Sequence, residues 1–172
     1  MSPRRDRGDR EASPREAPAR DASSADLLRD FFARSGAAAR ASRLLSREAR
    51  VQLELDRELA HFALLEGEPA IRPGAAGRAD FALRLPREAV LRLTALEDGD
   101  VGELGVTFLA LLLERDPSLK VRVRLDAPVS RIVGHGYLAV LALGGFKVAR
   151  WFVRNGFGSP MRAIERLRRH RG

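Results

Sequence analysis

The residues Gly134–Ala139, GHGYLA, match a glycine pattern that in other chains binds the diphosphate of a dinucleotide. That pattern works where it joins a strand to a helix inside a βαβ unit, with an acidic residue about 20 positions further on that binds the ribose. The corresponding segment here, RNGFGS at 154–159, holds no acid, and little chain remains for further βαβ units. We therefore expect these glycines, with Gly144 and Gly145, to permit close helix packing or to leave room for a ligand.

Other residue types that carry out chemistry are too scattered to form a recognisable site. The absence of cysteine excludes disulfides, thiolate metal ligands and a cysteine nucleophile. The histidines, His61, His135 and His170, lack a two-ligand spacing, although His135 between two glycines could serve as a polar group in a pocket. The acidic turn at 98–103 lacks the register of a calcium loop. We therefore predict no catalytic residue, no metal and no cofactor, and a protein that is not an enzyme.

Positive charge is concentrated at the end of the chain. The net charge is +8, and residues 147–172 hold eight Lys and Arg residues against one acid, Glu165. At helical spacing, Lys147, Arg150 and Arg154 form one stripe beside an apolar stripe. We predict that these three residues contact an anionic head group or membrane surface; the alternative is a core helix whose charged back faces water. Nucleic acid is not expected, because exposed aromatic residues do not alternate with the cations and no recognisable module appears.

The first 23 residues are typical of a disordered arm of mixed charge. After Met1 this segment has no aliphatic residue larger than alanine, so burial cannot offset the entropy lost on ordering. It also lacks the apolar stretch of a signal peptide. The longest uncharged apolar run, Gly134–Phe146, is shorter than the roughly 20 residues that a membrane span needs. We expect a cytoplasmic protein, with peripheral contact to a membrane as an option.

Hydrophobic periodicity predicts one α+β domain at 24–158, followed by a basic helix at 159–172. We expect Ser24 to cap the first helix and the segment EGEPAIRPGAAGR to form turns. The sheet should be mostly antiparallel or mixed, with four to five strands covered by helices. The expected strands are 51–56, 58–67 and 79–86, and the segment 116–126 is expected to form a turn followed by a fourth strand. The expected helices are 24–36, 86–96, 101–116 and 133–155.

Much of the chain, from about Val51 to Asn155, resembles the sterol carrier protein type-two superfamily. The segments VQLELD and ELAHFALLEGEPAIRPG are similar to the opening hairpin of that family, and ADFALRLPREAVLRL is similar to its strand with a preceding Asp and a following helix. The segments DVGELGVTFLALLLERDPSLKVRVRLDA and GYLAVLALGG resemble its second helix with a later strand and its apolar closing segment. The resemblance implies a small α+β domain that holds a lipid in an apolar tunnel.

The apolar helices at 101–114 and 137–153 lead to the same expectation. A helix that is apolar over a wide arc is buried, contacts lipid or lines a cavity. We therefore predict non-enzymatic binding or transfer of a lipid or other long hydrophobic molecule in an apolar cavity. The residues predicted to line it are Phe81, Leu83, Leu104, Phe108, Leu112, Tyr137, Leu141 and Trp151.

Two other functions stay open at this point. One is an accessory scaffold that contacts a partner protein in isoprenoid, quinone or lipid metabolism, because the resemblance includes relatives in ubiquinone synthesis. The other is a basic nucleic-acid-binding protein that uses the end of the chain.

Overall fold

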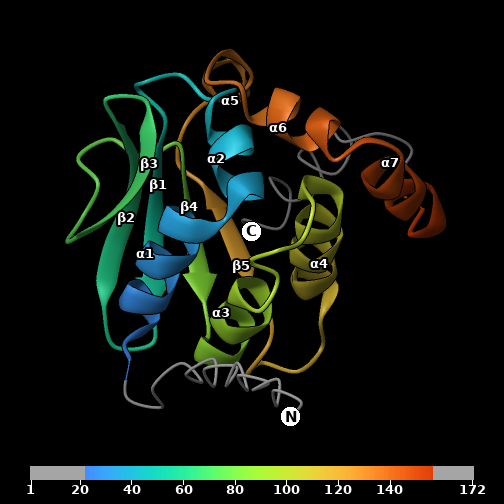
Figure 1. Cartoon of the computed structure of the whole chain (residues 1–172), viewed down its shortest axis with the longest axis horizontal. Coiled ribbons are helices and arrows are strands. Elements are labelled where there is room, and N and C mark those ends of the chain that lie inside the picture. Colours follow the sequence, from blue (N-terminus) through green and yellow to red (C-terminus); the bar gives the residue numbers. More distant parts are fainter. Residues whose placement is uncertain (1–21, 157–172) are drawn as a thin grey trace, which may run out of the picture.

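The computed structural model describes residues 22–156 (Figure 1). The predicted arm at 1–23, except its last two residues, and the predicted basic helix at 159–172 lie outside the described residues. The described elements are α1 (Ser24–Arg34), α2 (Gly36–Ser42), β1 (Arg50–Leu55), β2 (Leu59–Leu65), β3 (Glu68–Pro73), β4 (Phe81–Leu85), α3 (Arg87–Thr94), α4 (Val101–Leu113), β5 (Arg122–Leu125), α5 (Val129–Gly134), α6 (Tyr137–Leu143) and α7 (Gly145–Arg154).

The five strands form one mixed sheet in the order β3-β2-β1-β4-β5. The central strands β1 and β4 run parallel, and the three other neighbouring pairs are antiparallel. The prediction of an α+β fold with a mostly antiparallel or mixed sheet of four to five strands is confirmed.

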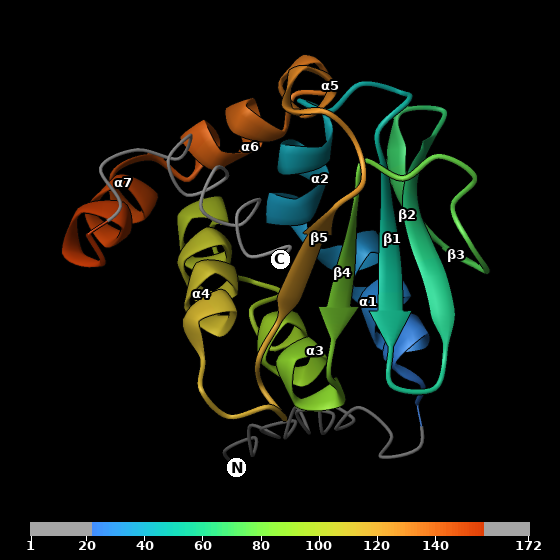
Figure 2. The same cartoon turned by 180° about the vertical axis from the view of Figure 1, so that it is seen from behind.

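Strand alternation gives the sheet one apolar and one polar face. Parallel register sets the apolar residues of β1 beside those of β4: Val51, Leu53, Leu55, Phe81, Leu83 and Leu85. Helices α1 to α4 lie on this apolar side, where α1 packs against β3 and α3 (Figure 1). The view from behind shows that no helix of the described part covers the opposite face (Figure 2). That face carries Gln52, Glu54, Arg84, Arg122 and Arg124.

Helix α7 reaches away from the sheet and packs mainly on α4. Leu109 of α4 forms a small second core with Val148 and Phe152 of α7. A Cβ atom added to Gly102 would lie 2.7 Å from the carbonyl oxygen of Gly144, so the missing side chain lets these backbones approach. Of the four glycines expected to permit close packing, Gly136 does so against the backbone of Leu44, whereas a Cβ atom added to Gly134 or Gly145 meets nothing within 4 Å.

Three local predictions differ from the structure. The cap of α1 is Ser23 rather than Ser24, since the Ser23 hydroxyl accepts from the amide of Asp26. The segment expected to form turns contains strand β3. It lies at the edge of the sheet, where proline is tolerated because only one side of the strand pairs.

The predicted continuous helix at 133–155 is divided into α5, α6 and α7. Gly136, which precedes α6, and Gly145, the first residue of α7, have positive φ angles of 87° and 58°, which the interior of an α-helix does not adopt. The division directs α6 and α7 along different lines past the end of α4 (Figure 1).

Candidate functional site

The eight residues predicted to line an apolar cavity share one property, which is that each is half-buried. None is fully buried in the core and none is fully exposed. They are Phe81, Leu83, Leu104, Phe108, Leu112, Tyr137, Leu141 and Trp151. Half-buried apolar side chains keep surface that a further apolar molecule can cover.

The structure brings five of these eight together on the main core. The five are Phe81, Leu83, Phe108, Leu112 and Tyr137. Leu112 also contacts the second core, where Trp151 packs. Leu104 and Leu141 belong to neither cluster. Six of the predicted residues therefore pack on one or both of the two cores, and two pack on neither.

The apolar face of the sheet becomes less covered from its centre toward the β5 edge. In β1, Val51, Leu53 and Leu55 are buried. In β5, Val123 and Leu125 are only half-buried, as are the β4 residues beside them. Within the described residues, the helices thus leave the β4–β5 end of this face partly open.

Helix α6 lies beside this open end, where the rings of Tyr137 and Phe81 are 4.9 Å apart, and its surface is apolar. Its sequence is YLAVLAL, yet none of its residues is buried. The exposed apolar surface continues into α7, where Phe146 and Val153 are 78% and 77% exposed. A helix of this composition is normally covered on at least one side, so α6 and the start of α7 present surface that fits an apolar partner.

The predicted head-group residues differ in their surroundings. Lys147 forms an ion pair with Asp100, the residue that caps α4. The hydrogen bond from Lys147 lowers the pKa of Asp100, and the same bond raises the pKa of Lys147. Arg150 and Arg154 are exposed and form no ion pair within residues 22–156. The two arginines are therefore freer than Lys147 to contact an anionic surface.

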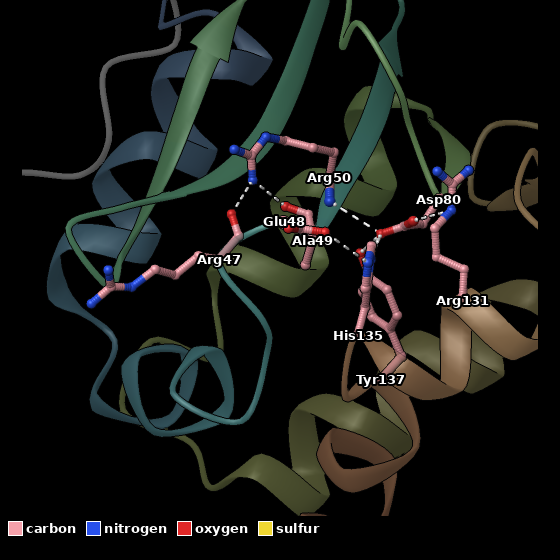
Figure 3. Close-up of polar contacts among 8 residues, drawn as sticks. All are labelled: Arg47, Glu48, Ala49, Arg50, Asp80, Arg131, His135 and Tyr137. Carbon is pink, nitrogen blue, oxygen red and sulfur yellow. Dashed lines mark hydrogen bonds and ion pairs between the residues drawn. The ribbon is translucent and has the colours of Figure 1, made fainter.

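A second feature, which the sequence reasoning missed, is a buried carboxylate at the start of β4 (Figure 3). Asp80 has no exposed surface. Its Oδ2 accepts from the Tyr137 hydroxyl at 2.8 Å and lies 2.8 Å from Nδ1 of His135. The amide of Arg50 donates to the same oxygen at 3.2 Å. Because an ionised carboxylate only accepts, Nδ1 of His135 carries the proton in this contact.

The other oxygen of Asp80 faces a guanidinium group. Nε of Arg131 lies 3.4 Å from Oδ1, close enough for an ion pair but without hydrogen-bond geometry. Burial, and then the bond to Asp80, raises the pKa of Tyr137, so its hydroxyl stays protonated and donates. The cluster joins β1, β4, α5 and α6 through one carboxylate.

A cleft of about 530 Å³ adjoins this cluster. Its lining residues are Glu48, Arg50, Gly77, Arg78, Arg131 and His135. Another cleft, of about 450 Å³, is lined by Glu88, Leu91, Arg92, Ala95, Ser118 and Leu119. Neither contains a residue of the predicted apolar site. His135 does line a pocket, as the sequence allowed, but that pocket is charged.

Two further searches of the described residues gave no site. Between residues 22 and 156, no group of three or more His, Asp or Glu residues is arranged to hold a metal ion. No helix in that range is long and apolar enough to cross a membrane.

Comparison with known proteins gave one structural similarity that we report here. No family model and no curated protein matches the chain. A solved "UbiJ-SCP2 Ubiquinone synthesis protein" aligns with a TM-score of 0.40 and 19% sequence identity, over 70% of this chain and 86% of that chain. The family resemblance stays a prediction.

Proposed function

We propose that the protein binds a lipid or other long hydrophobic molecule without changing it chemically. The observation that carries this proposal is the half-buried apolar surface at the β4–β5 end of the sheet, bordered by α4 and α6. We call it the lateral apolar surface and define it by Phe81, Leu83, Phe108, Leu112, Val123, Leu125, Tyr137 and Leu141.

The energetics of this surface fit a long ligand better than a small one. Covering the remaining surface of one half-buried Leu or Phe contributes about 1 kcal/mol. Association itself costs several kcal/mol in lost freedom, so several such residues must be covered at once. A long chain can contact β4, β5, α4 and α6 together, and a small apolar molecule cannot.

Replacing Leu141 with Asp tests the location of binding. The change removes an apolar contact and requires a carboxylate to lose water, so we expect uptake of a fluorescent long-chain fatty acid to weaken at least about tenfold. The fold should persist, because α6 buries no residue. Fluorescence titration measures the affinity, and circular dichroism checks the fold.

The matched control is Ala142→Asp, which adds the same charge at an exposed position of the same helix. We expect its affinity to stay close to that of the parent chain. Equal weakening in both variants would attribute the loss to charge alone, and unchanged binding by Leu141→Asp would remove Leu141 from the site.

The exposed apolar and charged residues of α7 favour peripheral contact with an anionic membrane as part of this function. Phe146 and Val153 supply exposed apolar groups, and Arg150 and Arg154 supply exposed charge on the same helix. Each arginine near an anionic surface contributes about 1 kcal/mol. We expect the double variant Arg150→Ala/Arg154→Ala to bind phosphatidylserine vesicles about 10- to 30-fold more weakly in a sedimentation assay at low salt.

The control for that experiment is Arg84→Ala/Arg122→Ala, which removes two exposed charges from the polar face of the sheet. It should retain most of the vesicle binding. A similar loss in both double variants would mean that net charge, rather than α7, determines binding.

The second candidate function, an accessory scaffold, is favoured by the nature of the two clefts. The cleft beside Asp80 is lined by polar and charged residues and one glycine, and the other cleft is half polar, so neither matches an apolar tunnel for a lipid. In that case the lateral apolar surface contacts a partner protein. Purified protein that contains no bound hydrophobic molecule would favour the scaffold over the lipid carrier.

A further inference from the structure

The cleft beside Asp80 gathers three arginines from separate parts of the chain. Two of them, Arg50 and Arg131, are drawn in Figure 3. Arg50 begins β1, Arg78 lies in the loop between β3 and β4, and Arg131 belongs to α5. With one acid, Glu48, among the lining residues, their formal charges sum to +2 when His135 is neutral. We name this feature the arginine cleft.

Contacts inside the protein leave much of the hydrogen-bonding capacity of these arginines unused. Nη1 of Arg50 donates to the carbonyl oxygens of Arg47 and Ala49, which fixes the side chain and leaves its other nitrogens available. Nε of Arg131 is buried 3.4 Å from Oδ1 of Asp80, so only the terminal nitrogens of this side chain can face the cleft. Arg78 is exposed and makes no hydrogen bond or ion pair with any other described residue.

The acids near the cleft offset only part of this charge, since Oδ1 of Asp80 lies 3.4 Å from Nε of Arg131, within ion-pair distance. Oδ2 of Asp80 is already shared by the amide of Arg50, the ring of His135 and the hydroxyl of Tyr137. The side chain of Glu48 is 88% exposed and lies 3.9 Å from Nε2 of His135. Glu48 therefore lies toward solvent, and its charge is screened by water.

The loop that supplies Arg78 is held in place by the sheet. The amide of Ala76 donates to the side chain of the buried Gln52 at 2.7 Å, and the amide of Asp80 donates to the carbonyl oxygen of Arg50 at 2.8 Å. Both anchors bracket Gly77 and Arg78. The backbone that carries Arg78 is thus held before any ligand arrives, which reduces the backbone entropy lost on binding.

We propose that the arginine cleft binds the phosphate group of a small molecule or lipid through Arg50, Arg78 and Arg131. Guanidinium groups match phosphate oxygens with paired hydrogen bonds. A phosphate monoester carries about −1.5 to −2 at pH 7 and three acceptor oxygens, so it can accept hydrogen bonds from more than one guanidinium group at once. A volume of about 530 Å³ lies within the range of small-molecule sites, so the cleft accommodates a phosphate with part of the molecule that bears it.

The test is titration of the full chain with inorganic pyrophosphate by calorimetry at low salt, together with vesicles that contain phosphatidic acid. We expect Arg78→Ala to weaken binding at least about tenfold, and Arg78→Lys to weaken it less, because lysine keeps the charge but not the paired bonds. Arg78 is exposed and unpartnered in the described part, so both variants should fold. The control is Arg92→Ala, which removes the same charge from the other cleft.

Each outcome bears directly on the proposal. Pyrophosphate binding that depends on Arg78 supports a soluble phosphate ligand, and Arg78-dependent binding to phosphatidic acid vesicles alone supports a lipid head group. Equal losses in Arg78→Ala and Arg92→Ala, or no binding of either probe, would overturn it. The inference does not rest on the lateral apolar surface, so Leu141→Asp should leave pyrophosphate binding unchanged.

Discussion

Replacing Asp80 with Ala should lower the free energy of unfolding by about 3–5 kcal/mol, the range found when one partner of a buried ion pair is removed. The carboxylate has no exposed surface and accepts from the Tyr137 hydroxyl, the His135 ring and the Arg50 amide. Its loss leaves these donors and the Arg131 guanidinium without their acceptor in a site that water reaches poorly. Urea unfolding followed by circular dichroism measures the change.

Asp26 offers the matched control for that experiment. It pairs with Arg29 at the exposed surface of α1, where ion pairs contribute little to stability. Asp26→Ala should leave the urea midpoint almost unchanged, while Asp80→Ala shifts it clearly. Equal midpoints for the two variants would show that the Asp80 cluster does not support the fold.

Replacing Gly136 with Ala should also destabilise the fold, by about 2–4 kcal/mol from backbone strain and overpacking together. The φ angle of Gly136 is 87°, which side-chain-bearing residues rarely adopt. A Cβ atom there would lie 2.0 Å from the carbonyl oxygen of Leu44, a backbone atom that cannot turn aside. Thermal and urea unfolding both report the loss.

Gly134, two residues earlier, is the control. It ends α5, and a Cβ atom added to it meets nothing within 4 Å. Gly134→Ala should therefore be neutral or should stabilise the protein by up to about 1 kcal/mol through helix propensity. If the two alanine variants are equally stable, the close approach of Gly136 to Leu44 is not a feature of the folded protein.

The strands show which part of the fold could be predicted from sequence. Alternation in VQLELD and ADFALRLP is enough to predict β1 and β4. It does not predict burial fully, because Gln52 and Ala82 on the other face are buried as well. Strand β3 could not be predicted in this way, because Pro69 and Pro73 indicate turns. A strand tolerates these prolines when it lies at the edge of a sheet, and the position of β3 at the edge is known only once the whole sheet is known.

Among the helices too, some are predictable from the sequence and others are not. The apolar run of α4 predicts a helix with its bounds nearly correct. The run from Val133 to Asn155 also has helical periodicity, yet Gly136 and Gly145 divide it. Glycine permits a positive φ angle without requiring it, so the break is decided by contacts with distant residues such as Leu44.

The two candidate sites also differ in how far the sequence alone predicts them. The lateral apolar surface consists mostly of residues that periodicity and the family resemblance already marked, since each lies on the apolar side of its own element. The Asp80 cluster joins residues 55 and 57 positions apart. The only local signal was a lone acid before an apolar strand, with His135 and Tyr137 two residues apart, and neither pattern indicates a partner.

Native mass spectrometry of the gently purified full chain tests most directly the claim that the lateral apolar surface holds a hydrophobic molecule. We expect a bound species that organic solvent extracts, that is identified as a lipid or other long apolar compound, and that is depleted in the Leu141→Asp variant. A spectrum of empty chain alone, together with no uptake of the fluorescent fatty acid, would contradict the account and leave the scaffold as the function to pursue.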